Sequence, residues 1–296
     1  MSTTSQQQQV QSFFDRIARN WRKSAEGNAD SVNVIAQRNN YVLRVADGRE
    51  NVRAALDVGC GTGELVHELC KRGVSALGVD FAPEMIQLAV DKVSANGLNG
   101  CEFICGSIFD YKPERKFDLI SANGFIEYIS PEQMRQFLGM AREWLTPGGS
   151  LVFGSRNRLF NAFSVNDYTA LELSRNTLVS LISEALIIGR SEDLITCIQQ
   201  LSRYRQELPT VKEHPKTGIE VATRHQYTPA ELIGMLETVD FHVAGLAPIH
   251  YHGVPPRFAK AHPHVHTAIS ESMDATPEHY LTPFASSFMV HAIAGQ

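Results

Sequence analysis

Three closely spaced glycines constrain this chain of 296 residues more than any other feature. The segment Ala55-Leu-Asp-Val-Gly-Cys-Gly-Thr-Gly63 reads as a buried strand that runs into a tight turn and opens a helix. Glycines at 59, 61 and 63 let the backbone pass where a Cβ would collide with a ligand, and the N–H groups at the helix start point into the gap. The segment therefore predicts a nucleotide-binding turn.

The spacing of these glycines argues against a dinucleotide. The fingerprint G-x-G-x-x-G needs a glycine at position 64, where this chain has Glu64. An acid in the first turn of the helix would repel a pyrophosphate. A second acid, Asp80, closes the apolar stretch that follows, and a carboxylate there can accept hydrogen bonds from both ribose hydroxyls.

Together, D-x-G-x-G-x-G and the acid at position 80 resemble motif I and the ribose acid of the class I S-adenosylmethionine (SAM)-dependent methyltransferases. From about residue 13 to 249 the chain looks like the ubiquinone-biosynthesis type of small-molecule O-methyltransferase. The resemblance implies SAM as the cofactor. It implies a SAM site made by Arg38 at the SAM carboxylate, Ser107 and Ile108 at the adenine edge, and Asp57, Gly59, Cys60, Gly61, Gly63, Asp80, Phe81, Met85 and Asn123.

Two positions depart from the family pattern. The family often has Asp where this chain has Ser107, and His where it has Tyr128. A hydroxyl accepts a hydrogen bond from the adenine amino group more weakly than a carboxylate does. Tyr128 removes the family's usual imidazole, so a general base has to come from elsewhere or be absent.

Alternating strand and helix patterns predict the fold. Strands are expected near residues 53–58, 74–80, 101–105, 117–122 and 150–155, and again at 241–250 and 287–293. This predicts an α/β fold: a Rossmann-like seven-stranded, mostly parallel sheet with helices on both faces and a helical cap insertion. The resemblance adds that the last strand runs antiparallel.

The same pass along the chain predicts four parts. Residues 1–50 form an N-terminal helical lid, in which 1–10 are disordered and 11–46 helical; residues 51–156 form the SAM-binding core. Residues 157–225 form the cap, and 226–296 complete the core, with a loop at 253–285 over the ligand-binding edge. We expect acceptor contacts from the lid, the cap and the segment before the cap: Trp21, Tyr128, Asn157, Phe160 and Tyr168.

Histidines gather where the sixth strand ends. A neutral imidazole can take a proton from a hydroxyl, so His250 and His252 are the preferred base candidates, with a structural strand-end histidine as the alternative. The run His262-Pro-His-Val-His266 alternates imidazoles, but its proline and the lack of nearby Cys or paired carboxylates favour a solvated loop. The fourth strand ends Ser121-Ala-Asn123, without the carboxylates that magnesium needs. No metal site is expected.

Composition narrows the partners. With a net charge of −5 and scattered Lys and Arg, nucleic acid is disfavoured. No signal segment or membrane-length apolar run is evident, which favours a cytoplasmic protein with no membrane partner. The five cysteines, an odd number in mostly apolar segments, are expected to be buried thiols.

The sequence favours methyl transfer to a hydroxyl of a small organic acceptor, such as a secondary metabolite, a quinone precursor or a sugar. N- or C-methylation on the same fold stays open, and so do a non-catalytic SAM-binding protein and, least favoured by Glu64, a nicotinamide dehydrogenase. The oligomeric state is left open.

Overall fold

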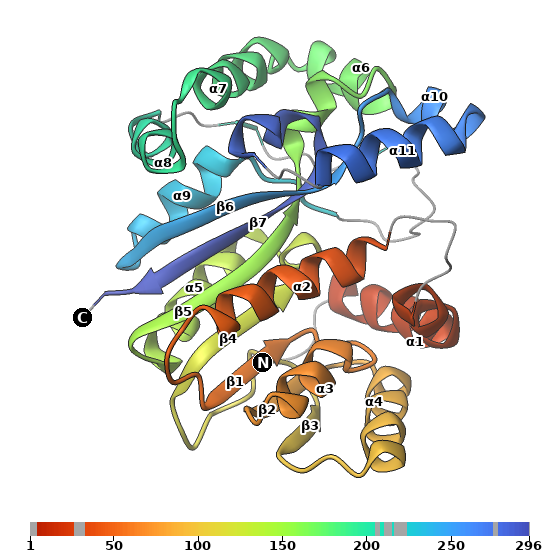
Figure 1. Ribbon diagram of the computed structural model, residues 1–296, viewed down its shortest axis with the longest axis vertical. Coiled ribbons are helices and arrows are strands. Elements are labelled where there is room, and N and C mark those ends of the chain that lie inside the picture. The colour runs from red at the N-terminus through yellow and green to blue at the C-terminus, as the bar shows by residue number, and fades with distance from the viewer. Residues whose placement is uncertain are drawn as a thin grey trace.

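A seven-stranded sheet in the order β3-β2-β1-β4-β5-β7-β6 organises the molecule (Figure 1). The computed structural model describes residues 5–26, 33–204, 208–209, 215, 224–274 and 278–295. The strands are β1 Ala54–Val58, β2 Ser75–Asp80, β3 Cys101–Cys105, β4 Phe117–Asn123, β5 Leu145–Arg156, β6 Phe241–Tyr251 and β7 Ala285–Ala294. The first five pair in parallel, whereas β7 lies antiparallel between β5 and β6. The predicted fold class is confirmed.

Helices cover both faces of the sheet because the central strands are apolar on both sides. On one face, β1, β4 and β5 pack against α2 (Val34–Asp47), α3 (Glu64–Lys71) and α4 (Pro83–Asn96). On the other face they pack against α5 (Pro131–Trp144) and α9 (Pro229–Glu237), each of which begins with a capping box and a proline in its first turn. The carboxyl ends of the parallel strands therefore form one edge between two helical layers.

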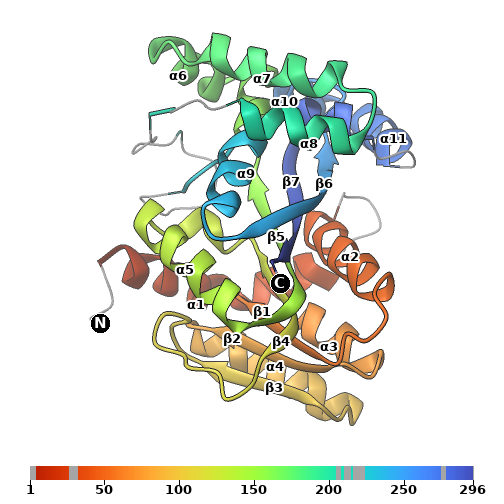
Figure 2. The same cartoon turned by 90° about the vertical axis from the view of Figure 1, so that its left-hand side faces the viewer.

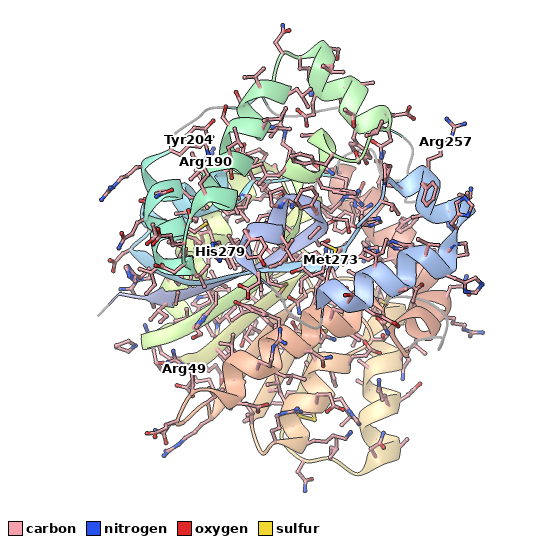
Figure 3. All side chains as sticks on the ribbon, turned by 45° about the horizontal axis from the view of Figure 1, so that its top comes forward. Arg49, Arg190, Tyr204, Arg257, Met273 and His279 are labelled. Atoms are coloured by element: carbon pink, nitrogen blue, oxygen red, sulfur yellow. A yellow bond between two sulfur atoms is a disulfide. The ribbon has the colours of Figure 1, made fainter. Side chains whose placement is uncertain are left out.

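A helical cap lies at the β6 end of the sheet, far from β3 (Figures 1 and 2). It consists of η2 (Arg158–Ala162), α6 (Asp167–Ser174), α7 (Leu178–Arg190) and α8 (Leu194–Arg203). Part of the expected cap, residues 205–207, 210–214 and 216–223, lies outside the described residues. Figure 3 shows His279 beneath the cap helices, on η3 (His279–Phe284), which contacts both α7 and β6.

Two expectations about chain ends and loops are wrong. Residues 253–285 were expected to form a loop but contain α10 (Pro256–Ala261), α11 (Pro263–Asp274) and η3, because prolines open α10 and α11 at their first positions. Residues 1–10 were expected to be disordered, yet α1 spans Ser5–Glu26, and the amides of Gln6 and Gln11 donate to backbone oxygens of the core. Residues 1–4 lie outside the described part.

The cysteine expectation is partly wrong. Cys60 and Cys197 are buried thiols, but Cys105 is exposed and Cys70 is joined to Cys101 by a disulfide. Cys70 lies in the last turn of α3 and Cys101 begins the edge strand β3; the sequence alone does not show that these two ends meet. None of the helices in the described part combines the length and apolar character that crossing a bilayer requires.

Candidate functional site

The glycine turn between β1 and α3 adopts the conformation that its sequence predicted. Gly59, Gly61 and Gly63 all have positive φ angles, of 69°, 53° and 75°. A Cβ at Gly63 would lie 2.9 Å from Cβ of Ala89, so this glycine lets α3 pack close to α4. The Gly59 N–H donates to the Val79 carbonyl at 2.8 Å, which ties the turn to the end of β2.

Asp80, at the end of β2, faces the same turn. Its Oδ2 accepts from the Gly61 N–H at 3.0 Å and its Oδ1 accepts from the Ala82 N–H at 2.9 Å. Burial raises the pKa of Asp80, and the backbone N–H groups oppose that rise. The carboxylate is thus fixed in one orientation beside the glycines.

Asp57 is the second buried acid of the turn. Its Oδ1 accepts from the Ser121 hydroxyl at 2.6 Å. Burial raises its pKa to about 7; the Ser121 hydrogen bond lowers it and the nearby charges of Asp80 and Glu64 raise it further. The negative charges of the two carboxylates therefore repel each other. A ligand that donates hydrogen bonds or carries positive charge would stabilise their ionised forms.

One cavity of about 430 Å³ opens at this edge of the sheet, within the roughly 300–1,000 Å³ range of ligand pockets. It is bordered by every predicted SAM residue except Gly63, whose role is to pack α3 against α4. Of the predicted acceptor residues whose side chains the structure describes, only Tyr128 borders it. Bordering residues that the sequence analysis did not assign include Gln7, Val10, Gln11, Phe14, Ile35, Asn39, Leu65, Phe109, Asp110, Phe125, Glu127, Ile129 and Arg224.

A charged group on the cavity wall was missed from sequence. Glu127 is only 1% exposed and lies between two arginines: Arg38 Nη2 at 3.2 Å and Arg224 Nε at 2.9 Å. Burial alone would raise the pKa of Glu127, but the charges of Arg224 and Arg38 outweigh it and hold this pKa below its usual range. Arg38 also donates to the Ser287 hydroxyl at 2.7 Å.

Helix α1 closes one side of the cavity. Phe14 packs edge-on against Tyr128, with ring centroids 5.3 Å apart, and the Gln11 amide donates to the Phe81 carbonyl at 2.7 Å. Burial raises the pKa of Tyr128 to about 12, so its phenol stays neutral. The side chain of Trp21 lies outside the described part of the chain.

Asn157, Phe160 and Tyr168, the other described acceptor candidates, do not border the cavity and make contacts elsewhere. The Asn157 amide donates to the carbonyls of Thr282 and Ala285, so it joins η2 to the start of β7. Tyr168 lies 5.7 Å from the Arg156 guanidinium. The ring of Phe160 packs at a tilt against that of His252, with ring centroids 4.9 Å apart.

Neither His250 nor His252 is one of the described residues that border the cavity. Burial is the main cause that lowers the pKa of His250 to about 3, and the neighbouring His252 and His266 lower it further. Burial and His266 lower the pKa of His252 to about 4. Both imidazoles are therefore neutral at physiological pH.

Known proteins resemble the part of the chain that carries this site. Residues 55–149 match the family model described as "Methyltransferase domain". A ubiquinone biosynthesis O-methyltransferase from Bradyrhizobium sp. is 31% identical over 111 residues, covering 37% of this chain and 42% of that protein. A malonyl-(acyl-carrier protein) O-methyltransferase from Halalkalibacterium halodurans is 31% identical over 157 residues, covering 48% of this chain and 56% of that protein. The match thus spans about half the length of these relatives or less.

Solved structures match over a larger part of the chain. The N-methyltransferase NodS from Bradyrhizobium japonicum, in complex with S-adenosyl-L-homocysteine, is 13% identical with a TM-score of 0.54, covering 97% of this chain and 100% of that one. Magnesium protoporphyrin IX methyltransferase from Synechocystis, with bound SAM, is 13% identical with a TM-score of 0.56, and both chains are covered fully. At this identity the likeness establishes the fold.

Proposed function

Because residues 55–149 form a SAM-binding methyltransferase domain of class I, we propose that this protein transfers the SAM methyl group to a hydroxyl of a small organic acceptor. One observation carries the proposal. A single cavity is bordered both by the acid and glycines of the SAM motif and by aromatic and charged residues beyond it, among them Phe14, Tyr128 and Arg224. Such a cavity can hold SAM and an acceptor side by side.

The chemistry asks for alignment more than for reactive groups. An O–CH₃ bond would form as the S–CH₃ bond breaks, the sulfur would keep that electron pair as a neutral thioether, and the hydroxyl proton would pass to a base or to bulk water. Holding the oxygen in line with that bond and excluding water account for most of the catalysis we expect. Phe14 and Tyr128 would pack against an apolar acceptor body, while Arg224 and Glu127 would meet a polar substituent.

The choice of oxygen rests on the two curated relatives, both of which are named as O-methyltransferases. Their similarity covers only 37% and 48% of this chain, whereas an N-methyltransferase shares the fold. N- or C-methylation is therefore the second candidate. Its support is the Glu127 carboxylate, since a carboxylate beside the cavity also suits a cationic amine.

His250 and His252 stay candidates for the base. Both are neutral, as a base requires, but conjugate acids with pKa values of about 3 and 4 take up protons weakly. We therefore expect replacing either histidine to slow transfer by less than the roughly 10²–10⁴ that loss of a well-matched base costs.

Product analysis tests the proposal directly. The protein is incubated with SAM carrying a ¹³C-labelled methyl group and a panel of phenols, hydroxy acids and sugars. The proposal expects a product heavier by one labelled methyl whose carbon shift is that of an O-methyl group. A label found on nitrogen or carbon supports the second candidate instead, and SAM binding without any product across lysate fractions favours a non-catalytic SAM-binding protein.

A further inference from the structure

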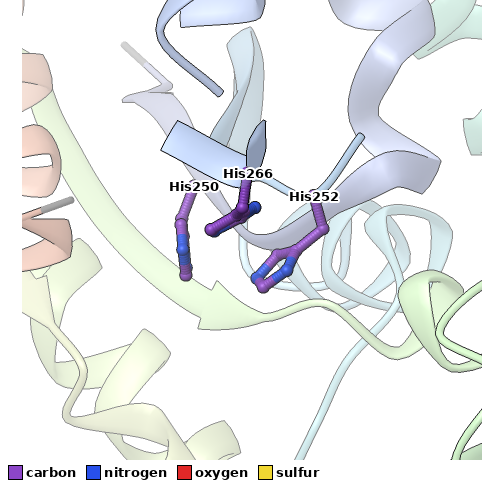
Figure 4. Close-up of side chains that lie close together, drawn as sticks. All are labelled: His250, His252 and His266. Atoms are coloured by element: carbon purple, nitrogen blue, oxygen red, sulfur yellow. The ribbon is translucent and has the colours of Figure 1, made fainter. Parts of the chain in front are cut away.

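Three histidines from two separate segments meet at the end of β6 (Figure 4). His250 lies near the end of β6, which stops at Tyr251, and His252 follows directly after the strand. His266 comes from α11. The ring centroids of His250 and His252 are 4.3 Å apart, and His266 lies 5.7 Å and 4.8 Å from them. One ring nitrogen of each lies within 4.8 Å of the other two.

The hydrogen bonds of this cluster are incomplete. Nδ1 of His250 pairs with the Ser286 hydroxyl at 2.9 Å, which leaves its Nε2 free. Nδ1 of His252 and Nδ1 of His266 are buried and find no hydrogen-bond partner within the described part of the chain. Buried ring nitrogens without partners are uncommon in folded proteins and call for an explanation such as a bound ion.

The backbone around the cluster is constrained as well. His250 has a φ angle of 57°, a left-handed conformation that a non-glycine residue adopts at a cost and that is common at functional sites. The His252 N–H donates to the Phe284 carbonyl at 2.8 Å. A Cβ at Gly253 would collide with Ile269 of α11, so glycine at this position lets α11 pack close enough for His266 to reach the other two imidazoles.

We propose that His250, His252 and His266 bind a divalent transition-metal ion of the zinc class. Neutral imidazole suits zinc, nickel, copper and ferrous iron, and His₃ is an established ligand set for zinc. In a tetrahedral site with Zn–N bonds of 2.0–2.1 Å the nitrogens lie about 3.3 Å apart, so the widest pair closes by about 1.5 Å through side-chain rotation. Ser286 would orient His250, as partners of metal-bound histidines do.

Positive charges near the cluster affect which fourth ligand the metal ion would take. Arg156 and Arg38 act electrostatically on His250, and Arg38 is already paired with Glu127. A doubly charged ion beside Arg156 is best accommodated with an anionic fourth ligand, such as hydroxide or an oxyanion. Three protein ligands leave that position open.

A histidine nitrogen that coordinates an ion cannot also accept a proton, so this role replaces the base role at the nitrogens involved. The site does not require methyl transfer. The test of metal binding can therefore succeed or fail independently of the proposed function.

Metal loading of the untagged full-length protein tests the site. Protein stripped with a chelator is titrated with Zn²⁺ against a chromophoric chelator, and Co²⁺ loading is followed by its visible absorption. We expect one equivalent per chain and the intense spectrum of four-coordinate Co²⁺. The Ser286→Ala variant should bind about 10- to 100-fold more weakly, because His250 loses its orienting partner.

Variants on α11 provide the matched comparison. His266→Ala should lose the bound equivalent, whereas His264→Ala, an exposed histidine on the same helix, should keep it. Circular dichroism checks that each variant folds, and His252→Ala replaces His266→Ala if the latter does not. Absence of stoichiometric binding in the wild type, or equal binding by a folded variant lacking His266 or His252, overturns the proposal.

Discussion

Asp57 is a single residue of this site whose burial makes the stability of the fold depend on pH. It is buried beside Asp80 and Glu64, and its pKa is raised to about 7. A carboxyl whose pKa is higher in the folded than in the unfolded state loses its proton on unfolding between those two values. Stability from this group is therefore fully present below about pH 4 and falls as the pH rises to about 7.

The Asp57→Asn variant should remove that slope. Asn keeps an oxygen that can accept from Ser121 but does not ionise. Its free energy of unfolding relative to wild type should increase from pH 4 to pH 7 by up to about 4 kcal/mol, and then level off. Denaturant unfolding of the ligand-free proteins across this range measures the difference. Parallel pH profiles of the wild type and Asp57→Asn would contradict the raised pKa of Asp57.

Site residues that belong to a motif within one short segment could be predicted from sequence. Site residues whose partners lie far away in the sequence could not. The glycine turn and Asp80 stand in one strand-turn-helix segment, so their spacing revealed the site. Glu127 meets Arg38 and Arg224 across about ninety residues in either direction, and nothing near it in the sequence indicates those partners. The same holds for His266, which sequence analysis grouped with the neighbouring His262 and His264 rather than with His250.

Among the elements, six strands were predicted to within two residues at each end because buried strands are apolar runs bounded by turn residues, whereas β5 begins at Leu145 and not near residue 150. Helix α1 was predicted from residue 11, whereas it begins at Ser5. The first turn of α1 is polar on every side. Its composition therefore does not show that the amides of Gln6 and Gln11 donate hydrogen bonds to the core.

Helix α1 is expected to act as a lid. It borders the cavity through Gln7, Val10 and Phe14, and Gln6 and Phe14 contact Tyr128 on the cavity wall. SAM together with an acceptor should slow hydrogen exchange in residues 5–20, while exchange in α5, on the opposite face of the sheet, stays unchanged. Exchange mass spectrometry with and without both ligands measures this. Equal exchange in α1 under both conditions would mean that it is a fixed wall.

In the whole molecule, part of the proposed acceptor surroundings lies outside the segment that matches the methyltransferase family model. Residues 55–149 supply the glycine turn and Asp80, whereas Arg224 and α1 lie outside that segment. This separation predicts that SAM affinity and acceptor preference can be changed independently.

Arg224→Ala tests the separation. It removes a cavity cation that pairs with Glu127, while Arg38 still neutralises that carboxylate. We expect the KM for the acceptor to rise at least about tenfold, which corresponds to roughly 1.4 kcal/mol, with the Kd for SAM changed less than about threefold. Steady-state kinetics and SAM calorimetry on the same preparation give both numbers. A loss confined to SAM binding would place Arg224 at the cofactor instead.

Calorimetric titration of SAM into the wild type and the Asp80→Ala variant tests the central claim most directly. On the proposed assignment, the ribose donates two hydrogen bonds to the Asp80 carboxylate, each worth about 1.5–3 kcal/mol, and the variant would lose both. The account predicts saturable one-site binding to the wild type and at least about tenfold weaker binding to a folded Asp80→Ala, with Asp91→Ala unchanged. Equal SAM affinity in wild type and folded Asp80→Ala, or NADH binding in place of SAM, would contradict it.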